Sequence, residues 1–69
     1  MRLRELRVRK LYSIRGLARA AQVSEKSIRA VEAGQWRPSL ATIRKLSQLL
    51  EVDPMDVDEF KEAMQRAME

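Results

Sequence analysis

The segment from residue 23 to residue 38, VSEKSIRAVEAGQWRP, carries charged and hydrogen-bonding side chains at helical spacing, and such groups can bind a charged partner. At about 100° per residue of an α-helix, Glu25, Lys26 and Arg29 fall on one side, whereas Ile28 and Val31 fall on the other. The polar side offers charged and hydrogen-bonding groups to a molecule outside the domain. The segment therefore predicts an amphipathic helix with one side packed on the domain and the other side open to a partner.

The ends of this helix are marked by its own residues. Ser24 suits the N-cap, and Gly34 suits the left-handed residue that follows a helix C-terminus. A preceding helix is expected to start after Ser13 and to end at about Ala21, which leaves only residues 22–24 as the connection. Two helices joined by so short a turn form a helix-turn-helix, which can place its second helix in a DNA major groove.

Five segments carry helical signals, and together they predict an all-α fold, a compact five-helix bundle in one domain over residues 1–69. The expected helices are approximately residues 2–11, 14–21, 25–33, 40–51 and 54–68. The inward positions expected of the first helix are Leu3, Leu6 and then Val8 or Leu11. The main wall of the core is expected from the fourth helix, with Leu40, Ile43, Leu46, Leu49 and Leu50.

Composition limits the class of protein. The 69 residues include no cysteine and no histidine, so neither disulfides nor a zinc site can support the core, and packed local elements must do so. A secreted domain of this size would usually need disulfides, which favours an intracellular, cytoplasmic setting. No apolar run approaches the ~20 residues of a membrane span, and the charged N-terminus lacks the apolar block of a signal peptide.

Charge is distributed unevenly along the chain. Residues 1–50 hold 12 basic and three acidic residues, a net charge of +9, whereas residues 51–69 hold two basic and seven acidic residues, a net charge of −5. A basic body fits an anionic partner that docks on the N-terminal part, although ordinary mixing of surface charges would also produce this pattern.

Several motifs in register resemble the phage-repressor type of helix-turn-helix, the Cro/cI-like or XRE regulators, over about residues 3–57. They are LRELR at residues 3–7, S-x-x-x-L-A at 13–18, VS-x-x-S-I at 23–28, VEAG at 31–34, RPSLATIRKL at 37–46 and LLEVDP at 49–54. The resemblance implies a lambda repressor-like DNA-binding domain. It also implies sequence-specific binding of double-stranded DNA by a prokaryotic or phage-encoded transcriptional regulator, with repression as the expected outcome.

The resemblance further implies roles for individual residues. The base-contacting residues would be Glu25, Lys26 and Arg29, although Glu25 and Arg29 could instead simply pair on the helix surface. The phosphate-contacting residues would be Ser13, Arg15, Ser24, Ser27, Gln35, Trp36 and Arg37. Trp36 could equally pack against the edge of the core. Arg7 and Glu32 would form a structural ion pair between the first and third helices.

Three positions depart from the family pattern. Ile14 replaces the glutamine that usually begins the second helix, so one expected DNA contact is missing. Gly16 stands where an acidic residue often completes a capping box. Gln22 replaces the usual turn glycine, which either forces a non-glycine residue into the left-handed conformation or reshapes the turn.

Partners follow from the same resemblance. Relatives usually dimerise, so a homodimer on a partly palindromic operator is expected, with the fifth helix or the end of the fourth as the interface. Phe60, Met64 and Met68 form an apolar stripe that suits either this interface or the core. The alternative is a protein-interaction module, antitoxin-like or a regulatory subunit, that uses the fifth helix and binds DNA weakly or not at all.

No catalytic activity is expected, because the chain has no histidine, no cysteine and no glycine-rich phosphate loop. The acidic group at residues 53–59 lacks the glycine and the spacing of a calcium loop, so no metal is expected there. The sequence also gives no sign of a cofactor, a small-molecule ligand or a membrane partner.

Overall fold

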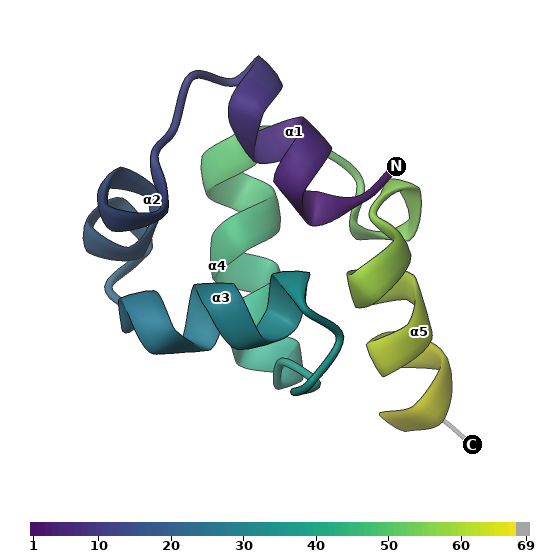
Figure 1. Ribbon diagram of the computed structural model, residues 1–69. Coiled ribbons are helices and arrows are strands. Elements are labelled where there is room, and N and C mark those ends of the chain that lie inside the picture. The colour runs from purple at the N-terminus through teal and green to yellow at the C-terminus, as the bar shows by residue number, and fades with distance from the viewer. Residues whose placement is uncertain (68–69) are drawn as a thin grey trace.

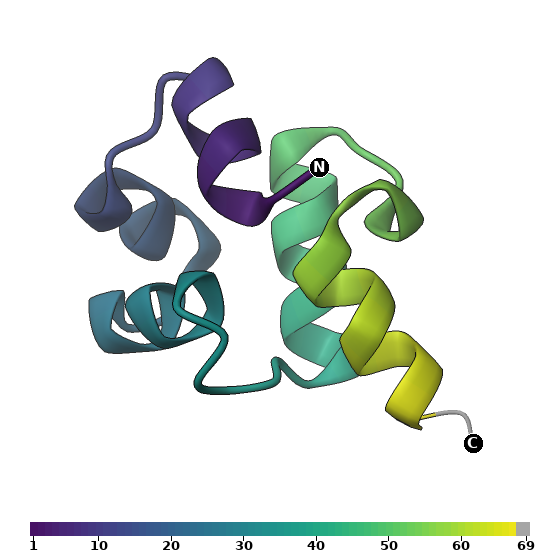
Figure 2. The same cartoon turned by 45° about the vertical axis from the view of Figure 1, so that its right-hand side comes forward.

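The computed structural model describes residues 1–67, and this part of the chain is all-helical with no strand, as the sequence predicts (Figure 1). The elements are α1 (Leu3–Arg9), α2 (Ile14–Ala21), α3 (Glu25–Glu32), α4 (Leu40–Leu50), the 3-10 turn η1 (Pro54–Asp56) and α5 (Asp58–Ala67). Helix α4 runs through the middle, with α2 and α3 on one side and α5 on the other (Figure 2). The predicted helix end at Met68 lies outside the described residues.

Three of the helices begin at a serine that caps them. The Ser13 hydroxyl accepts a hydrogen bond from the Gly16 amide at 2.9 Å, and Ser24 accepts one from the Ser27 amide at 3.0 Å. Ser39 does the same for Thr42 at 3.2 Å, at the start of α4. Each hydroxyl satisfies an amide that has no carbonyl partner in the first turn of its helix. These caps fix where α2, α3 and α4 start.

Helices α1 to α4 are each followed, one or two residues after the helix, by a residue in the left-handed conformation. These residues are Leu11, Gln22, Gly34 and Glu51, with φ of 63°, 59°, 73° and 56°. The next amide in the chain then donates to a carbonyl five residues back, for example Val23 to Ala18 at 2.9 Å and Gln35 to Ala30 at 2.9 Å. Three of the four residues are not glycine. Of the two outcomes expected at Gln22, the structure contains the left-handed residue.

One core is formed by apolar side chains from every helix. Its largest fully buried members are Phe60, Leu3, Leu17, Ile28, Leu46, Leu50, Val31 and Val57. Burial of each large aliphatic or aromatic side chain contributes about 1.5–3 kcal/mol of transfer free energy. Because Phe60 is fully buried, it belongs to the core and is not part of an exposed stripe on α5.

The predicted length and inner face of α1 are wrong at its C-terminal end. Val8 is 55% exposed and Leu11 is 92% exposed, so neither turns inward. The helix stops at Arg9 because Leu11 takes the left-handed conformation that ends it. The inward position after Leu6 is Arg7, which lies one turn from Leu3 on the same face and is 8% exposed.

Two further expectations are corrected at the C-terminal half. The predicted helix 54–68 is divided into η1 and α5, because Val57 adopts an extended conformation between them. Asp53 Oδ1 accepts a hydrogen bond from the Met55 amide at 2.9 Å and caps η1. The break turns Val57 fully into the core. Leu40, expected in the core wall, is the first residue of α4 and is 48% exposed, so the buried wall of this helix starts at Ile43.

A buried glutamate at the start of α5 accepts a hydrogen bond from the first residue of α1. No side chain of α1 caps that helix, and instead the Leu3 amide donates to Glu59 Oε1 of α5 at 2.9 Å. The Asp58 amide donates to the Met1 carbonyl at 2.8 Å beside it. Glu59 is only 8% exposed, so a charged group is buried where it can satisfy a helix N-terminus.

Candidate nucleic-acid interface

Helix α3 presents its three candidate base-reading side chains outward. Glu25, Lys26 and Arg29 are all exposed, whereas Ile28 and Val31 on the opposite side are each 1% exposed. The two apolar residues belong to the hydrophobic core, whereas the three charged side chains stay exposed within residues 1–67. This arrangement gives α3 one anchored side and one side available to a partner.

Glu25 and Arg29 pair on this face, but loosely. Their closest oxygen and nitrogen atoms are 3.7 Å apart, and the two side chains are 45% and 65% exposed. An exposed pair of this kind contributes at most about 1 kcal/mol and exchanges readily with other partners. The pairing considered as the alternative role is therefore present, and it is weak enough that both groups can turn to a ligand.

The starts of α2 and α3 offer donors suited to an anion. Ser13 and Ser24 cap these helices and are exposed, as is Arg15 in the first turn of α2. The Ser24 and Ser27 hydroxyls lie 2.7 Å apart and share a hydrogen bond. The first amides of a helix lack intrahelical acceptors and carry the positive end of the helix dipole, which makes such starts suitable for phosphate.

A shallow groove runs between α2 and α3 on the same face. Its lining includes Arg15 and Arg19 from α2 together with the cap residue Ser24 and the first residue of α3, Glu25. Arg19 was not assigned a role from the sequence. The available signal was its position one turn after Arg15, since residues four apart lie on the same helix face. The groove adds a second arginine to the candidate interface.

The loop between α3 and α4 carries the remaining candidates. Gln35, Trp36 and Arg37 are exposed, and Trp36 retains 43% of its surface accessible. Trp36 and Arg37 also line a small cavity together with Glu62 and Arg66 of α5. The indole thus lies in part beside α5 and is in part exposed, and its contact with a nucleic acid stays a prediction.

The inner end of α3 is held by a buried ion pair. Arg7 Nε lies 2.7 Å from Glu32 Oε2, and its Nη2 lies 3.2 Å from Oε1, so the guanidinium grips the carboxylate with two hydrogen bonds. The third donor, Nη1, reaches the Tyr12 carbonyl at 2.9 Å. Arg7 thereby connects α1, the loop before α2 and the end of α3. Because Arg7 holds the C-terminal end of α3, it also helps to set the direction in which the exposed side of the helix faces.

Residues 1–60 match the family model of the helix-turn-helix domain. The chain belongs to that family. The match covers α1 to α4, η1 and the first residues of α5, so it includes every element of the interface described above. A comparison with curated proteins and one with solved structures each returned no significant match. Membership of this helix-turn-helix family supports binding to DNA and a role in transcription regulation.

The described residues contain neither a metal-ligand cluster nor a membrane-spanning helix. Residues 1–67 contain no group of three or more acidic side chains arranged to hold a metal ion. Of the acids near α5, Asp53 caps η1 and Glu59 binds the Leu3 amide. No helix in the described part of the chain is long and apolar enough to cross a membrane.

Proposed function

We propose that this helix-turn-helix domain is a sequence-specific transcriptional regulator of the Cro/cI-like (XRE) kind that acts as a repressor and inserts α3 into the major groove. The observation that carries the proposal is the uncovered outer face of α3. It bears two cations and one carboxylate within two turns of one rigid helix. In this proposal Lys26 and Arg29 donate to guanine, and Glu25 accepts from cytosine or excludes other bases.

The groove side of α2 holds the phosphate backbone in this proposal. Ser13, Arg15 and the Ser24–Ser27 pair contact one strand through hydroxyls, a guanidinium and the free amides of two helix starts. The loop of residues 35–37 contacts the backbone on the other side of α3. These contacts set the register of the protein on the duplex and carry no base code.

The proposed regulator acts as a homodimer on a partly palindromic operator. One short helix in one groove binds weakly, and two copies can occupy half-sites about 34 Å apart on the same side of the duplex. A cytoplasmic, prokaryotic or phage-encoded setting goes with this type of regulator. No catalytic activity, cofactor or small-molecule ligand is part of the proposal.

The rival role, a protein-interaction module centred on α5, is the weaker proposal. It needs the apolar stripe of α5 to be free for a partner. Phe60 is fully buried in the core, and Met64 packs against the core and is only partly accessible. Met68 lies outside the described residues.

Selection of bound duplexes from a random pool tests the function. The wild-type chain is expected to enrich one partly palindromic sequence with at least one G·C pair in each half-site. Lys26→Ala and Arg29→Ala should each relax preference at one base position, at a cost of about 1–3 kcal/mol in discrimination. Lys61→Ala removes an exposed cation from α5 and serves as the matched control. Recovery of the wild-type preference at full strength by both α3 variants would refute the assignment of these readers.

A further inference from the structure

Two apolar side chains at the C-terminal end of α1 lie in solvent. Val8 is 55% exposed and Leu11 is 92% exposed, and neither belongs to the core of residues 1–67. Val8 stands about 140° around the helix from the buried Leu3, on the outer side of α1. The Leu11 amide donates to the Val8 carbonyl at 3.0 Å, so the two residues share the last turn of the helix.

Leucine at position 11 suits neither its backbone conformation nor its exposure. Within residues 1–67, three residues other than glycine are left-handed, namely Leu11, Gln22 and Glu51. Gln22 and Glu51 are polar and exposed, as expected of a turn in contact with water. Leu11 bears the cost of the left-handed conformation and also leaves an apolar side chain in solvent. Folding of the domain therefore gives no reason for a leucine here, whereas contact with another molecule does.

Positive charge surrounds these two side chains. The exposed charged residues between positions 2 and 11 are four cations and one carboxylate, a net charge of +3. The carboxylate, Glu5, lies 3.2 Å from Arg9 and is already paired. Arg2 is 3.9 Å from Asp58, which is the outer limit of an ion pair.

The remaining two cations lie next to the apolar residues. Arg4 and Lys10 form no ion pair with a carboxylate of residues 1–67. Arg4 precedes Val8 by one helical turn on the same side of α1, and Lys10 adjoins Leu11 in the chain. A shallow hollow of about 440 Å³ lies beside Arg4 and Val8. Arg4, Val8, Lys10 and Leu11 together are called the α1 patch below.

The α1 patch is separate from the candidate DNA-binding face. Arg7, on the inner side of α1, reaches Glu32 at the end of α3, whereas Arg4 and Val8 lie on the outer side and are exposed. In both views of the fold α1 lies above α3 (Figures 1 and 2). A molecule bound to the α1 patch therefore leaves the exposed side of α3 open.

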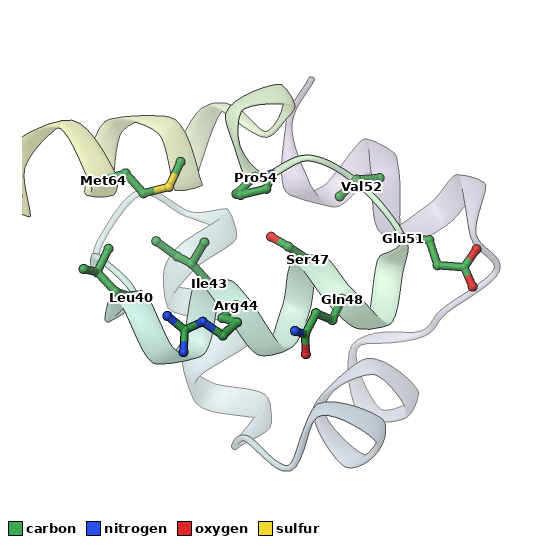
Figure 3. A pocket seen from close by; sticks show the side chains of 9 residues that line it. All are labelled: Leu40, Ile43, Arg44, Ser47, Gln48, Glu51, Val52, Pro54 and Met64. Atoms are coloured by element: carbon green, nitrogen blue, oxygen red, sulfur yellow. The ribbon is translucent and has the colours of Figure 1, made fainter.

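A second apolar surface of the domain shows how charge selects a partner. A groove along α4, with Ile43 and Met64 in its lining, carries an arginine and a glutamate, Arg44 and Glu51 (Figure 3). Charges of both signs in one groove do not favour a partner of either sign. The α1 patch, in contrast, combines apolar side chains with unpaired cations alone. It is therefore complementary to a partner that is both acidic and partly apolar.

The geometry points to the α1 patch as a docking site for an acidic segment of another protein, one that carries apolar side chains among its carboxylates. Val8 and Leu11 are removed from water by the apolar side chains of the segment, and its carboxylates pair with Arg4 and Lys10. The phosphate backbone of DNA matches the cations but offers no apolar surface. A lipid bilayer is bound by a wider apolar face than one valine and one leucine supply. The inference goes beyond the proposed function and does not require DNA binding.

Selection of a displayed library of random short peptides on the intact chain tests the docking site. The peptides enriched at low salt should be acidic and contain aliphatic or aromatic residues, and their affinity should fall as salt screens the exposed charges. Arg4→Glu should weaken binding of the most enriched peptide about tenfold, because an attractive contact becomes repulsive. Leu11→Gly keeps every cation and should weaken it about tenfold as well, because the apolar contact is lost.

The controls separate docking from folding. Arg44→Glu makes the same charge change at an exposed arginine of α4 and should leave the affinity for the peptide unchanged. Arg4 and Leu11 are both exposed and outside the core, so their variants should unfold at or above the wild-type temperature. Weaker binding by a chain that remains this stable comes from the surface and not from misfolding.

Several results would overturn the inference. One is a selection that enriches no acidic peptides, and another is acidic peptides that bind both α1 variants as tightly as wild type. Binding of phosphatidylglycerol vesicles that is lost in both variants assigns the α1 patch to a membrane instead. A salt slope of DNA binding that falls by about 1 in Arg4→Glu assigns it to the phosphate backbone. Self-association of the wild-type chain that is lost in both variants assigns it to a second copy.

Discussion

Helix α3 carries a glutamate at each end, and each glutamate pairs with an arginine. The two pairs differ in their distance and in their exposure to solvent. Glu32 faces inward and meets Arg7 at 2.7 Å, with both side chains 10% exposed. Glu25 faces outward and lies 3.7 Å from Arg29, with both side chains largely in solvent. The inner pair is fully used in holding α3 to α1. The outer pair is loose, and its groups are available to something else.

The comparison teaches that residue type alone does not distinguish a structural charge from a functional one. Both pairs consist of arginine and glutamate, and both involve the same helix. Burial decides the difference, because a charge removed from water must keep its partner, whereas an exposed charge loses little when its partner leaves.

Removal of one carboxylate from each pair gives the largest expected difference. Glu32→Ala leaves the buried Arg7 guanidinium without its carboxylate and should lower the free energy of unfolding by about 3–5 kcal/mol. Glu25→Ala should lower it by less than about 1 kcal/mol, because its pair is exposed to solvent. Urea denaturation followed by circular dichroism measures both values.

The matched change at Glu25 is the control for loss of a glutamate from α3. If Glu32→Ala melts at the wild-type temperature, the inner pair does not hold the helix. If the two variants lose equal stability, burial is not what separates the pairs.

A smaller effect on stability is expected at the left-handed residues that follow α1 and α3. Leu11 is 92% exposed and left-handed, so its side chain contributes little packing and its backbone conformation is costly. Leu11→Gly should raise the free energy of unfolding by about 1 kcal/mol, whereas Gly34→Ala should lower it by about the same amount. A Cβ at Gly34 would meet no atom within 4 Å, so backbone strain is the only cost there.

Thermal unfolding of the two variants beside wild type measures these opposite shifts. Destabilisation by Leu11→Gly would mean that the exposed leucine makes a contact that residues 1–67 do not contain.

Local signals were sufficient to predict much of the fold. The serines that cap α2, α3 and α4 and the glycine after α3 stand at positions that the sequence marks directly, because caps and left-handed residues depend on near neighbours. The all-helical class follows from helical spacing and is confirmed by the structure and by the family match.

Long-range effects account for the features that the sequence did not reveal. Leu11 reads as a core residue by spacing, but the end of α1 turns it outward. Glu59 reads as a surface acid, but it serves the start of α1, which is 56 residues away along the chain. The break at Val57 likewise accompanies the complete burial of this residue in the core, and periodicity alone cannot distinguish such a break from a continuous helix.

The candidate site was predicted in part. The outward positions of Glu25, Lys26 and Arg29 follow from the spacing of α3, since the apolar residues occupy the other side. Arg19 was not predicted as part of the site, because its place in the groove between α2 and α3 depends on how the two helices pack.

The central claim, that the outer face of α3 enters a DNA duplex, is tested most directly by titration of wild-type protein with duplex DNA at increasing salt. We expect binding at low salt whose affinity falls linearly with salt on a logarithmic scale, as several phosphate contacts release counterions. Arg15→Ala should reduce the magnitude of that slope by about 1, because one phosphate contact is lost. Arg29→Ala should weaken binding mainly to the selected sequence. Absence of binding even at low salt, by a chain that is folded, would contradict the account.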